Sequence, residues 1–169
     1  MIFLEERITM KKQLVFTAII ALLALELILA GCTPKAPQPQ GNSNPQEPTV
    51  LAGTNSKLFE FNKEAYEAAK ASDKIVLLYF YAKWCPECKK EVPKMQAAFN
   101  ELTTDNVVGF RVHYNDDQTG DDAKALAREY GIAFQHTKVI LKNGQKILKS
   151  PESWDKERYL TEITNALNA

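Results

Sequence analysis

An unbroken apolar run, Ile75–Tyr81, is the feature that most restricts how this chain can fold. The run has the length of a β-strand, it is rich in residues that favour sheets, and it shows no alternation of apolar and polar side chains. A strand of this kind has to be covered on both faces. The run therefore predicts the central strand of a sheet that is flanked by helices, which is an α/β fold.

The segments around this run alternate between strand and helix patterns. Asn62 suits a helix cap, Gly131 suits a helix stop, and the Lys-Asn-Gly sequence ending at Gly144 is typical of a tight hairpin. The expected order is β-α-β-α-β-α-β-β-α. Strands are expected at 57–61, 74–81, 106–114, 137–141 and 145–149, and helices at 62–72, 86–102, 121–131 and 153–168.

The N-terminal part has the pattern of a secreted lipoprotein. A basic pair follows Met10 and precedes the apolar run Leu14–Ala30, which is short for a spanning helix of about 20 residues. The Leu-Ala-Gly-Cys sequence that ends at Cys32 resembles the bacterial lipobox, in which the cysteine is lipidated and becomes the mature N-terminus. We therefore expect a signal peptide over 1–31, with translation starting at Met10 as an option. An uncleaved anchor helix with an incidental cysteine is the alternative.

A lipid on Cys32 would anchor the mature chain on the extracytoplasmic face of the membrane, where disulfides persist. Residues 32–56 hold this cysteine and a proline-rich stretch with almost no large apolar side chain, which cannot offset its own ordering entropy. We expect a disordered linker here and a folded domain over 57–169. Cys85 and Cys88 would then be the only thiols of the mature protein.

Composition sets the number of domains and excludes one class of partner. Apolar residues make up 45% of the 169 positions, which is enough for one ordinary core. The 21 Lys and Arg residues balance 21 Asp and Glu residues, so nothing predicts nucleic-acid binding. We expect one monomeric folded domain.

Cys85 and Cys88 are separated by two residues and have three candidate roles. A structural zinc site needs about four ligands, and besides this pair the mature chain offers only His113 and His136. A disulfide between residues so close in sequence removes little unfolded-state entropy, which disfavours a purely structural staple. The remaining role is redox chemistry.

The position of the pair supports the redox role. The apolar strand ends near Tyr81, and Pro86 suits the first turn of a helix, which places Cys85 at the helix N-terminus. Unpaired N–H groups and the helix dipole stabilise a thiolate there. Cys88 lies one turn further on the same face, within reach of a disulfide. We expect Cys85 to be the exposed nucleophile and Cys88 to resolve the mixed disulfide.

The Trp84–Cys88 sequence after a buried strand, with Pro93 in the following helix, resembles the thioredoxin family over residues 57–169. The stretch Cys88–Pro93 is especially similar to the membrane-anchored, extracytoplasmic reductases of cytochrome c maturation. The resemblance implies a thioredoxin fold with a central mixed sheet, and a protein-disulfide reductase without a cofactor other than its redox-active disulfide. It also implies protein disulfides as substrates and a membrane thiol carrier as electron donor.

Three neighbours of the cysteines are expected to shape the active-site surface and its reduction potential. Trp84 should form part of the flat apolar surface on which an extended substrate docks. Pro86 and Glu87 lie between the cysteines. A carboxylate beside a thiolate disfavours the anion, so Glu87 favours the reducing half of the family's range of potentials.

His136 stands where nearly all members of the family have a cis-proline beside the active site. A cis bond before a residue other than proline costs about 2.5 to 4 kcal/mol, so we expect a trans Gln135–His136 peptide. The imidazole has three candidate roles: tuning of the nucleophile or substrate contact, a metal ligand beside both cysteines, or packing against Trp84.

Tyr79 is the second departure, because many thioredoxins bury an aspartate there as proton acceptor for the resolving cysteine. A tyrosine cannot accept that proton near neutral pH. The role is absent, is carried by water, or falls to His136 or Glu91. His113 is expected to face solvent or to be satisfied by a neighbouring group, and Trp154 is expected to be structural.

We predict a lipid-anchored thiol–disulfide oxidoreductase that acts on protein disulfides. The alternative from another class is a noncatalytic metal-binding lipoprotein that uses Cys85, Cys88 and His136.

Overall fold

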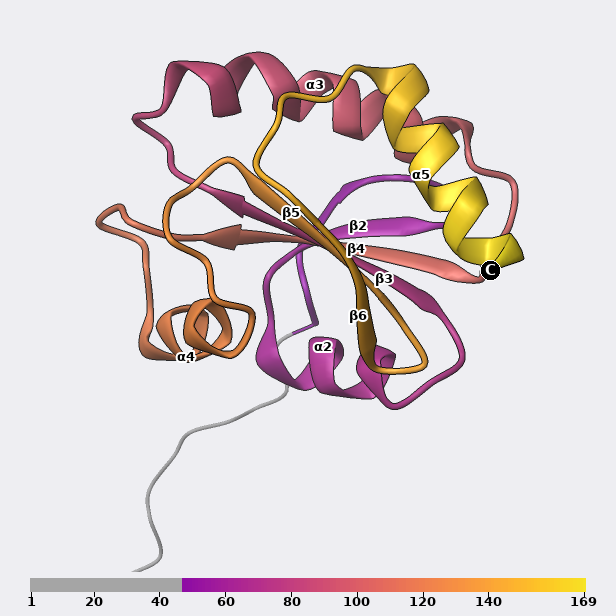
Figure 1. Ribbon diagram of the computed structural model, residues 1–169, viewed down its shortest axis with the longest axis horizontal. Coiled ribbons are helices and arrows are strands. Elements are labelled where there is room, and N and C mark those ends of the chain that lie inside the picture. Colours follow the sequence, from indigo (N-terminus) through magenta and orange to yellow (C-terminus); the bar gives the residue numbers. More distant parts are fainter. Residues whose placement is uncertain (1–46) are drawn as a thin grey trace, which may run out of the picture. The chain divides into compact units, whose positions relative to one another are not determined.

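The structure is a computed structural model that describes residues 47–169 (Figure 1). The expected signal peptide over 1–31, the start at Met10 and the lipid on Cys32 lie outside the described residues. Among the described residues, no helix is both long and apolar enough to span a bilayer.

The described chain folds into one mixed sheet with helices on both faces, which confirms the predicted α/β class. The strands are β1 (Val50–Ala52), β2 (Lys57–Glu60), β3 (Ile75–Tyr81), β4 (Val107–His113), β5 (Thr137–Lys142) and β6 (Gln145–Ser150). The helices are α2 (Lys63–Lys70), α3 (Pro86–Glu101), α4 (Asp121–Glu129) and α5 (Lys156–Asn168).

Strand β3 is central, as its unbroken apolar sequence predicts. The strand order is β1-β2-β4-β3-β5-β6, and β3 runs parallel to β4 and antiparallel to β5. Leu77 and Tyr79 face the core beneath α3 and α5, whereas Leu78 and Phe80 face the core beneath α2 and α4. Figure 1 shows these two helix pairs on opposite faces of the sheet.

The local signals have the expected geometry. Asn62 Oδ1 accepts a hydrogen bond from the Ala65 N–H at 2.9 Å at the start of α2. Gly131 follows α4 with a φ of 62°, and Asn143 and Gly144 turn the β5–β6 hairpin with φ values of 51° and 71°. Positive φ at these positions explains the glycines and the asparagine.

Strand β1 corrects the expected domain boundary. Val50–Ala52 falls in the segment that composition predicts to be linker, yet it pairs antiparallel with β2. The N–H of Gly53 also donates to Asn100 Oδ1 on α3 at 2.8 Å. The folded part therefore begins before residue 57. A three-residue strand is too short to show a periodic pattern, which is why the sequence does not reveal it.

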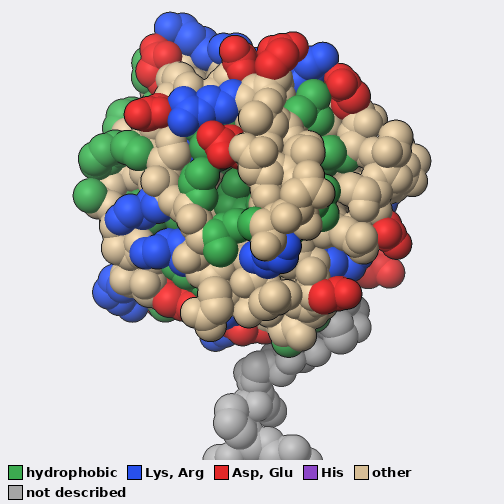
Figure 2. All heavy atoms as spheres, turned by 45° about the vertical axis from the view of Figure 1, so that its right-hand side comes forward, with side chains coloured by type: hydrophobic (Ala, Val, Ile, Leu, Met, Phe, Trp, Pro, Cys, Tyr) green, Lys and Arg blue, Asp and Glu red, His purple; other side chains and the backbone are tan. Residues whose placement is uncertain are grey.

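Charged side chains of both signs are interspersed over the face drawn in Figure 2. Most carboxylates around α4 pair locally: Asp122 with Lys63, Asp121 with Lys124 and Glu129 with Lys70. The drawn face carries no broad patch of a single sign, in agreement with the balanced composition.

Candidate active site

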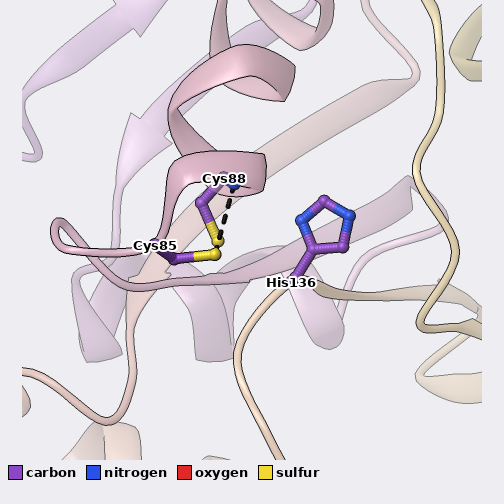
Figure 3. A group of neighbouring side chains, drawn as sticks. All are labelled: Cys85, Cys88 and His136. Atoms are coloured by element: carbon purple, nitrogen blue, oxygen red, sulfur yellow. Dashed lines mark hydrogen bonds between the residues drawn. The ribbon is translucent and has the colours of Figure 1, made fainter.

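The carboxyl end of β3 leads through a short turn into α3, and this turn holds the first cysteine. Cys85 is the N-cap residue of α3, and its sulfur accepts a hydrogen bond from the Cys88 N–H at 3.4 Å (Figure 3). Pro86 occupies the first helical position. The predicted placement of the Cys85 sulfur at the positive end of the helix is confirmed.

The two thiols differ in accessibility. Cys85 is 6% exposed and Cys88 is 0% exposed, and both are free. Cys85 is thus the more accessible of the two thiols. The expectation that it is openly exposed is wrong, because most of its surface is covered. Burial raises the pKa of Cys88 to about 11, so Cys88 is a protonated thiol at neutral pH. This difference fits an attacking Cys85 and a resolving Cys88.

The backbone of His136 has a conformation that proline cannot take. Its φ is 70°, and no cis peptide occurs in residues 47–169, which confirms the predicted trans bond. The His136 N–H donates to the carbonyl of Phe80 at 2.6 Å. A proline has neither a positive φ nor an N–H. The departure from the family therefore changes the local backbone as well as the side chain.

The His136 ring lies against Tyr79, which does not support packing against Trp84, one of the three candidate roles. The ring meets Tyr79 edge-on with 6.1 Å between centroids, and Nδ1 is 3.2 Å from the Tyr79 hydroxyl. Nε2 is 3.0 Å from Ser153 Oγ and 3.1 Å from Glu91 Oε2. Burial and the charge of Lys138 lower the pKa of His136, which keeps the ring neutral at neutral pH.

A buried ion pair that the sequence does not predict lies beside this histidine. Glu91 Oε1 is 2.9 Å from Lys138 Nζ, with side chains 2% and 0% exposed. The Tyr159 hydroxyl donates to Glu91 Oε1 at 2.6 Å. One signal was available: Lys138 interrupts the apolar pattern of a strand that pairs directly with β3.

Tyr79 occupies the centre of this polar group. It is fully buried, and its hydroxyl contacts both Cys88 and His136. Burial, and then the charge of Glu91, raise the pKa of Tyr79 far above its ordinary value. Tyr79 therefore keeps its proton near neutral pH and is not a free base for Cys88, as a tyrosine at this position predicts.

Trp84 and Phe134 are exposed next to the cysteine turn and the histidine turn. They are 53% and 50% exposed, which agrees with an apolar surface at Trp84. Trp84 Nε1 donates to the carbonyl of Asn115 at 2.8 Å, which fixes the indole. Phe134 was not singled out from sequence, because one apolar residue in a loop has no distinguishing pattern.

Glu87 projects into solvent and pairs with Lys90 at 2.9 Å. The hydrogen bond from Lys90 lowers the pKa of Glu87. A paired and solvated carboxylate acts weakly on a neighbouring thiolate, so the structure lends less support to a Glu87 effect on the potential than the sequence suggests.

His113 is a satisfied histidine and Trp154 is a core residue, as expected. His113 Nδ1 lies 2.8 Å from Asp116 Oδ2. Trp154 is 0% exposed and packs edge-on against Tyr159 with 5.0 Å between ring centroids.

Among His, Cys, Asp and Glu side chains of residues 47–169, one group could hold a metal ion. It comprises Cys85, Cys88 and His136, whose ligand atoms all lie within 4.8 Å of one another. The same three residues were considered as metal ligands from sequence, and the structure brings them together.

Comparison with known proteins places this site in a family. The model of the AhpC/TSA family matches residues 53–161. A thioredoxin of Malassezia sympodialis is 31% identical over 84 residues, which are 50% of this chain and 74% of that protein. A protein disulfide-isomerase of Aspergillus niger is 34% identical over 79 residues, 46% of this chain but 21% of that relative's length.

The solved structures agree with these relatives. Thioredoxin F from spinach chloroplast, in its short form, superposes with a TM-score of 0.55 at 27% identity, covering 69% of this chain and 99% of that one. The fold, the paired cysteines at a helix start and the family match lead to one assignment. The chain belongs to the AhpC/TSA family and, with it, to the thioredoxin family of thiol–disulfide oxidoreductases.

Proposed function

We propose that this protein reduces protein disulfides outside the cytoplasmic membrane, to which a lipid on Cys32 anchors it. The observation that carries the redox part is the Cys85 sulfur at the start of α3, 3.4 Å from the Cys88 nitrogen. The lipobox-like sequence that ends at Cys32 supports the anchored location, as does the similarity of Cys88–Pro93 to extracytoplasmic reductases.

The reaction has two exchange steps. The Cys85 thiolate attacks one sulfur of a substrate disulfide, forms a mixed disulfide and releases the other substrate sulfur as a thiolate. Cys88 then loses its proton and attacks the Cys85 sulfur, which releases the second substrate thiol. Two electrons pass to the substrate, and the protein is left with a Cys85–Cys88 disulfide.

The second step needs an acceptor for the Cys88 proton, because burial raises the pKa of this thiol to about 11. The Tyr79 hydroxyl contacts Cys88 and lies 3.2 Å from His136 Nδ1. Tyr79 can pass its own proton to the neutral imidazole while it takes the proton of Cys88. Glu91, 3.1 Å from Nε2, stabilises the imidazolium that results.

A membrane thiol carrier is the proposed electron donor that returns the disulfide to the dithiol. Support for it comes from the similarity to anchored reductases, since an extracytoplasmic reductant needs electrons from across the membrane. The same exchange chemistry, run in reverse, reduces the Cys85–Cys88 pair.

Insulin reduction by the full chain tests the activity. Cys32→Ser serves as the reference, because it leaves Cys85 and Cys88 as the only thiols. We expect Cys85→Ser to lose the activity, and Cys88→Ser to accumulate mixed disulfides that identify substrates on mass spectrometry. Insulin reduction at the reference rate by Cys85→Ser would contradict the mechanism.

The location is tested separately. Mass spectrometry of the mature protein from membranes of a bacterial host should show a diacylglycerol on an N-terminal Cys32. An intact N-terminus ahead of an unmodified Cys32 would contradict the anchored form.

A further inference from the structure

The three ligand atoms of Cys85, Cys88 and His136 form a preassembled coordination site. All of them lie within 4.8 Å of one another. Two sulfurs that bind one ion at about 2.3 Å each are about 4 Å apart when the angle between them is about 120°. Small side-chain rotations therefore suffice to bring the three atoms onto one ion.

The three residues come from two rigid parts of the fold. The cysteines are fixed by the first turn of α3, and the Cys88 N–H bonds to the Cys85 sulfur. His136 is fixed by its N–H bond to Phe80, directly before β5. Figure 3 shows the imidazole beside the two sulfurs, with one ring nitrogen facing the cysteines and the other turned away.

The contacts of the imidazole place its lone pair on the nitrogen that faces the cysteines. Nε2 lies 3.0 Å from Ser153 Oγ and 3.1 Å from Glu91 Oε2, and because a carboxylate oxygen can only accept, the ring proton belongs on Nε2. Nδ1, on the side of the cysteines, then carries the lone pair, which accepts a hydrogen bond from the Tyr79 hydroxyl at 3.2 Å and which a bound ion would take over. In metal sites generally, a carboxylate that accepts the proton of the second ring nitrogen orients the histidine ligand.

Glu91 supplies a second and independent observation. Its side chain is 2% exposed, and its Oε2 has no hydrogen-bond partner among the described residues, although His136 Nε2 lies 3.1 Å away. Oε1 is already satisfied by Lys138 and Tyr159. A buried carboxylate oxygen aimed only at this ring is best satisfied when Nε2 carries the proton.

The donor set selects the class of ion. Two thiolates are soft donors and an imidazole is a borderline donor, a combination that favours monovalent copper or zinc. Zinc takes about four ligands, whereas the group among residues 47–169 stops at three. Cys85 and Cys88 are 6% and 0% exposed, which leaves little room for water as a fourth ligand. Monovalent copper is satisfied with three.

We propose that the reduced protein binds one Cu(I) ion through Cys85 Sγ, Cys88 Sγ and His136 Nδ1, with Glu91 holding the imidazole. Binding forms two Cu–S bonds and one Cu–N bond and releases the two thiol protons to solvent. Copper stays monovalent and no electron is exchanged. The Cys85–Cys88 disulfide has no thiolates, so the oxidised protein does not bind Cu(I) at this site.

The test is an anaerobic competition for Cu(I) against bicinchoninate, with the full-length Cys32→Ser chain as reference. We expect one ion per reduced chain and no binding to the disulfide form. His136→Asn removes the imidazole while asparagine tolerates a positive φ, and it should weaken binding at least tenfold. His113→Asn, which changes the other histidine, should bind as the reference does. Equal affinity of His136→Asn and the reference would overturn the proposal.

X-ray absorption of the copper-loaded reference gives an answer that does not depend on any variant. Two sulfur ligands and one nitrogen ligand are expected, and a site with sulfur ligands alone would overturn the assignment of His136. Because insulin reduction is measured on metal-free protein, an active reductase that does not bind copper would defeat this inference alone. Copper binding by a chain without reductase activity would defeat the proposed function alone.

Discussion

Glu91 Oε1 lies 2.9 Å from Lys138 Nζ, and both side chains are inside the core. The pair connects α3 to β5. Tyr159 on α5 donates a hydrogen bond to Glu91, which connects α5 to the same pair. A buried charge is tolerated only while its partner is present, because each ion has lost its water.

The first prediction concerns this pair. We expect Glu91→Leu to lower the free energy of unfolding by about 3 to 5 kcal/mol, because Lys138 is left as an uncompensated buried charge. Glu91→Leu combined with Lys138→Met should be more stable than Glu91→Leu alone. Urea unfolding measures the stability of both variants. Glu101→Leu is the control: it breaks the exposed pair with Lys156 and should lower the free energy of unfolding by about 1 kcal/mol or less. A double variant less stable than Glu91→Leu would contradict a paired role.

The second prediction restores the family's residue at position 136. We expect His136→Pro to lose about 3 kcal/mol or more of stability, because proline cannot adopt the φ of 70° and cannot donate to the Phe80 carbonyl. His136→Asn is the matched control, since asparagine keeps the N–H and accepts the positive φ. Thermal unfolding of the two variants measures the difference. A His136→Pro protein as stable as His136→Asn would show that this backbone is not required.

Some features of the fold and of the site could be predicted from the sequence because they depend on one segment alone. The unbroken run Ile75–Tyr81 predicted the central strand, because burial on both faces leaves a pattern within one segment. The cost of a cis bond predicted the trans peptide at His136. Both inferences use information that is local in the chain.

The ion pair and β1 depend on contacts between distant segments. Glu91 and Lys138 are each ordinary charged residues in their own segments, and only the packing of α3 beside β5 makes them a buried pair. Strand β1 is defined by its partner β2 and not by its own three residues. The orientation of the His136 ring follows from Glu91 and Ser153 in the same way.

The third prediction concerns the two thiols. Since burial raises the pKa of Cys88 to about 11, only Cys85 should react with iodoacetamide in the folded, reduced protein at about pH 8. Peptide mass spectrometry after a short exposure measures the extent at each cysteine. In urea, where the burial is removed, both should be alkylated. Equal alkylation in the folded state would contradict the assignment of Cys85 as the attacking thiol.

The fourth prediction concerns the exposed Trp84. If it forms the docking surface, Trp84→Ala should raise the KM for insulin by roughly fivefold, the effect of losing about 1 kcal/mol of contact. The rate with a small disulfide such as hydroxyethyl disulfide should stay unchanged, because that substrate is too small to need the surface. Ile147→Ala removes an equally exposed apolar residue on β6 and is the control. A matching loss with the small disulfide would indicate a direct effect on Cys85 instead.

The fifth prediction follows from Asp116, which accepts hydrogen bonds from the N–H groups of Lys83 and Gln118 and lies beside His113. Burial opposes its charge, but the hydrogen bonds with His113 and with the two N–H groups outweigh burial and hold the pKa of Asp116 below its ordinary value. A folded pKa below the unfolded value of about 3.9 stabilises the fold above that pH, and the stabilisation is lost as the pH falls through the folded value.

We therefore expect Asp116→Asn to be less stable than the reference at about pH 7, with the difference shrinking towards about pH 3 as Asp116 in the reference becomes protonated. Urea unfolding followed by tryptophan fluorescence at both pH values measures it. Asp121→Asn is the control, because that carboxylate is 98% exposed and should change stability little at either pH. A difference that is the same at both pH values would mean that Asp116 acts through its shape and not through its charge.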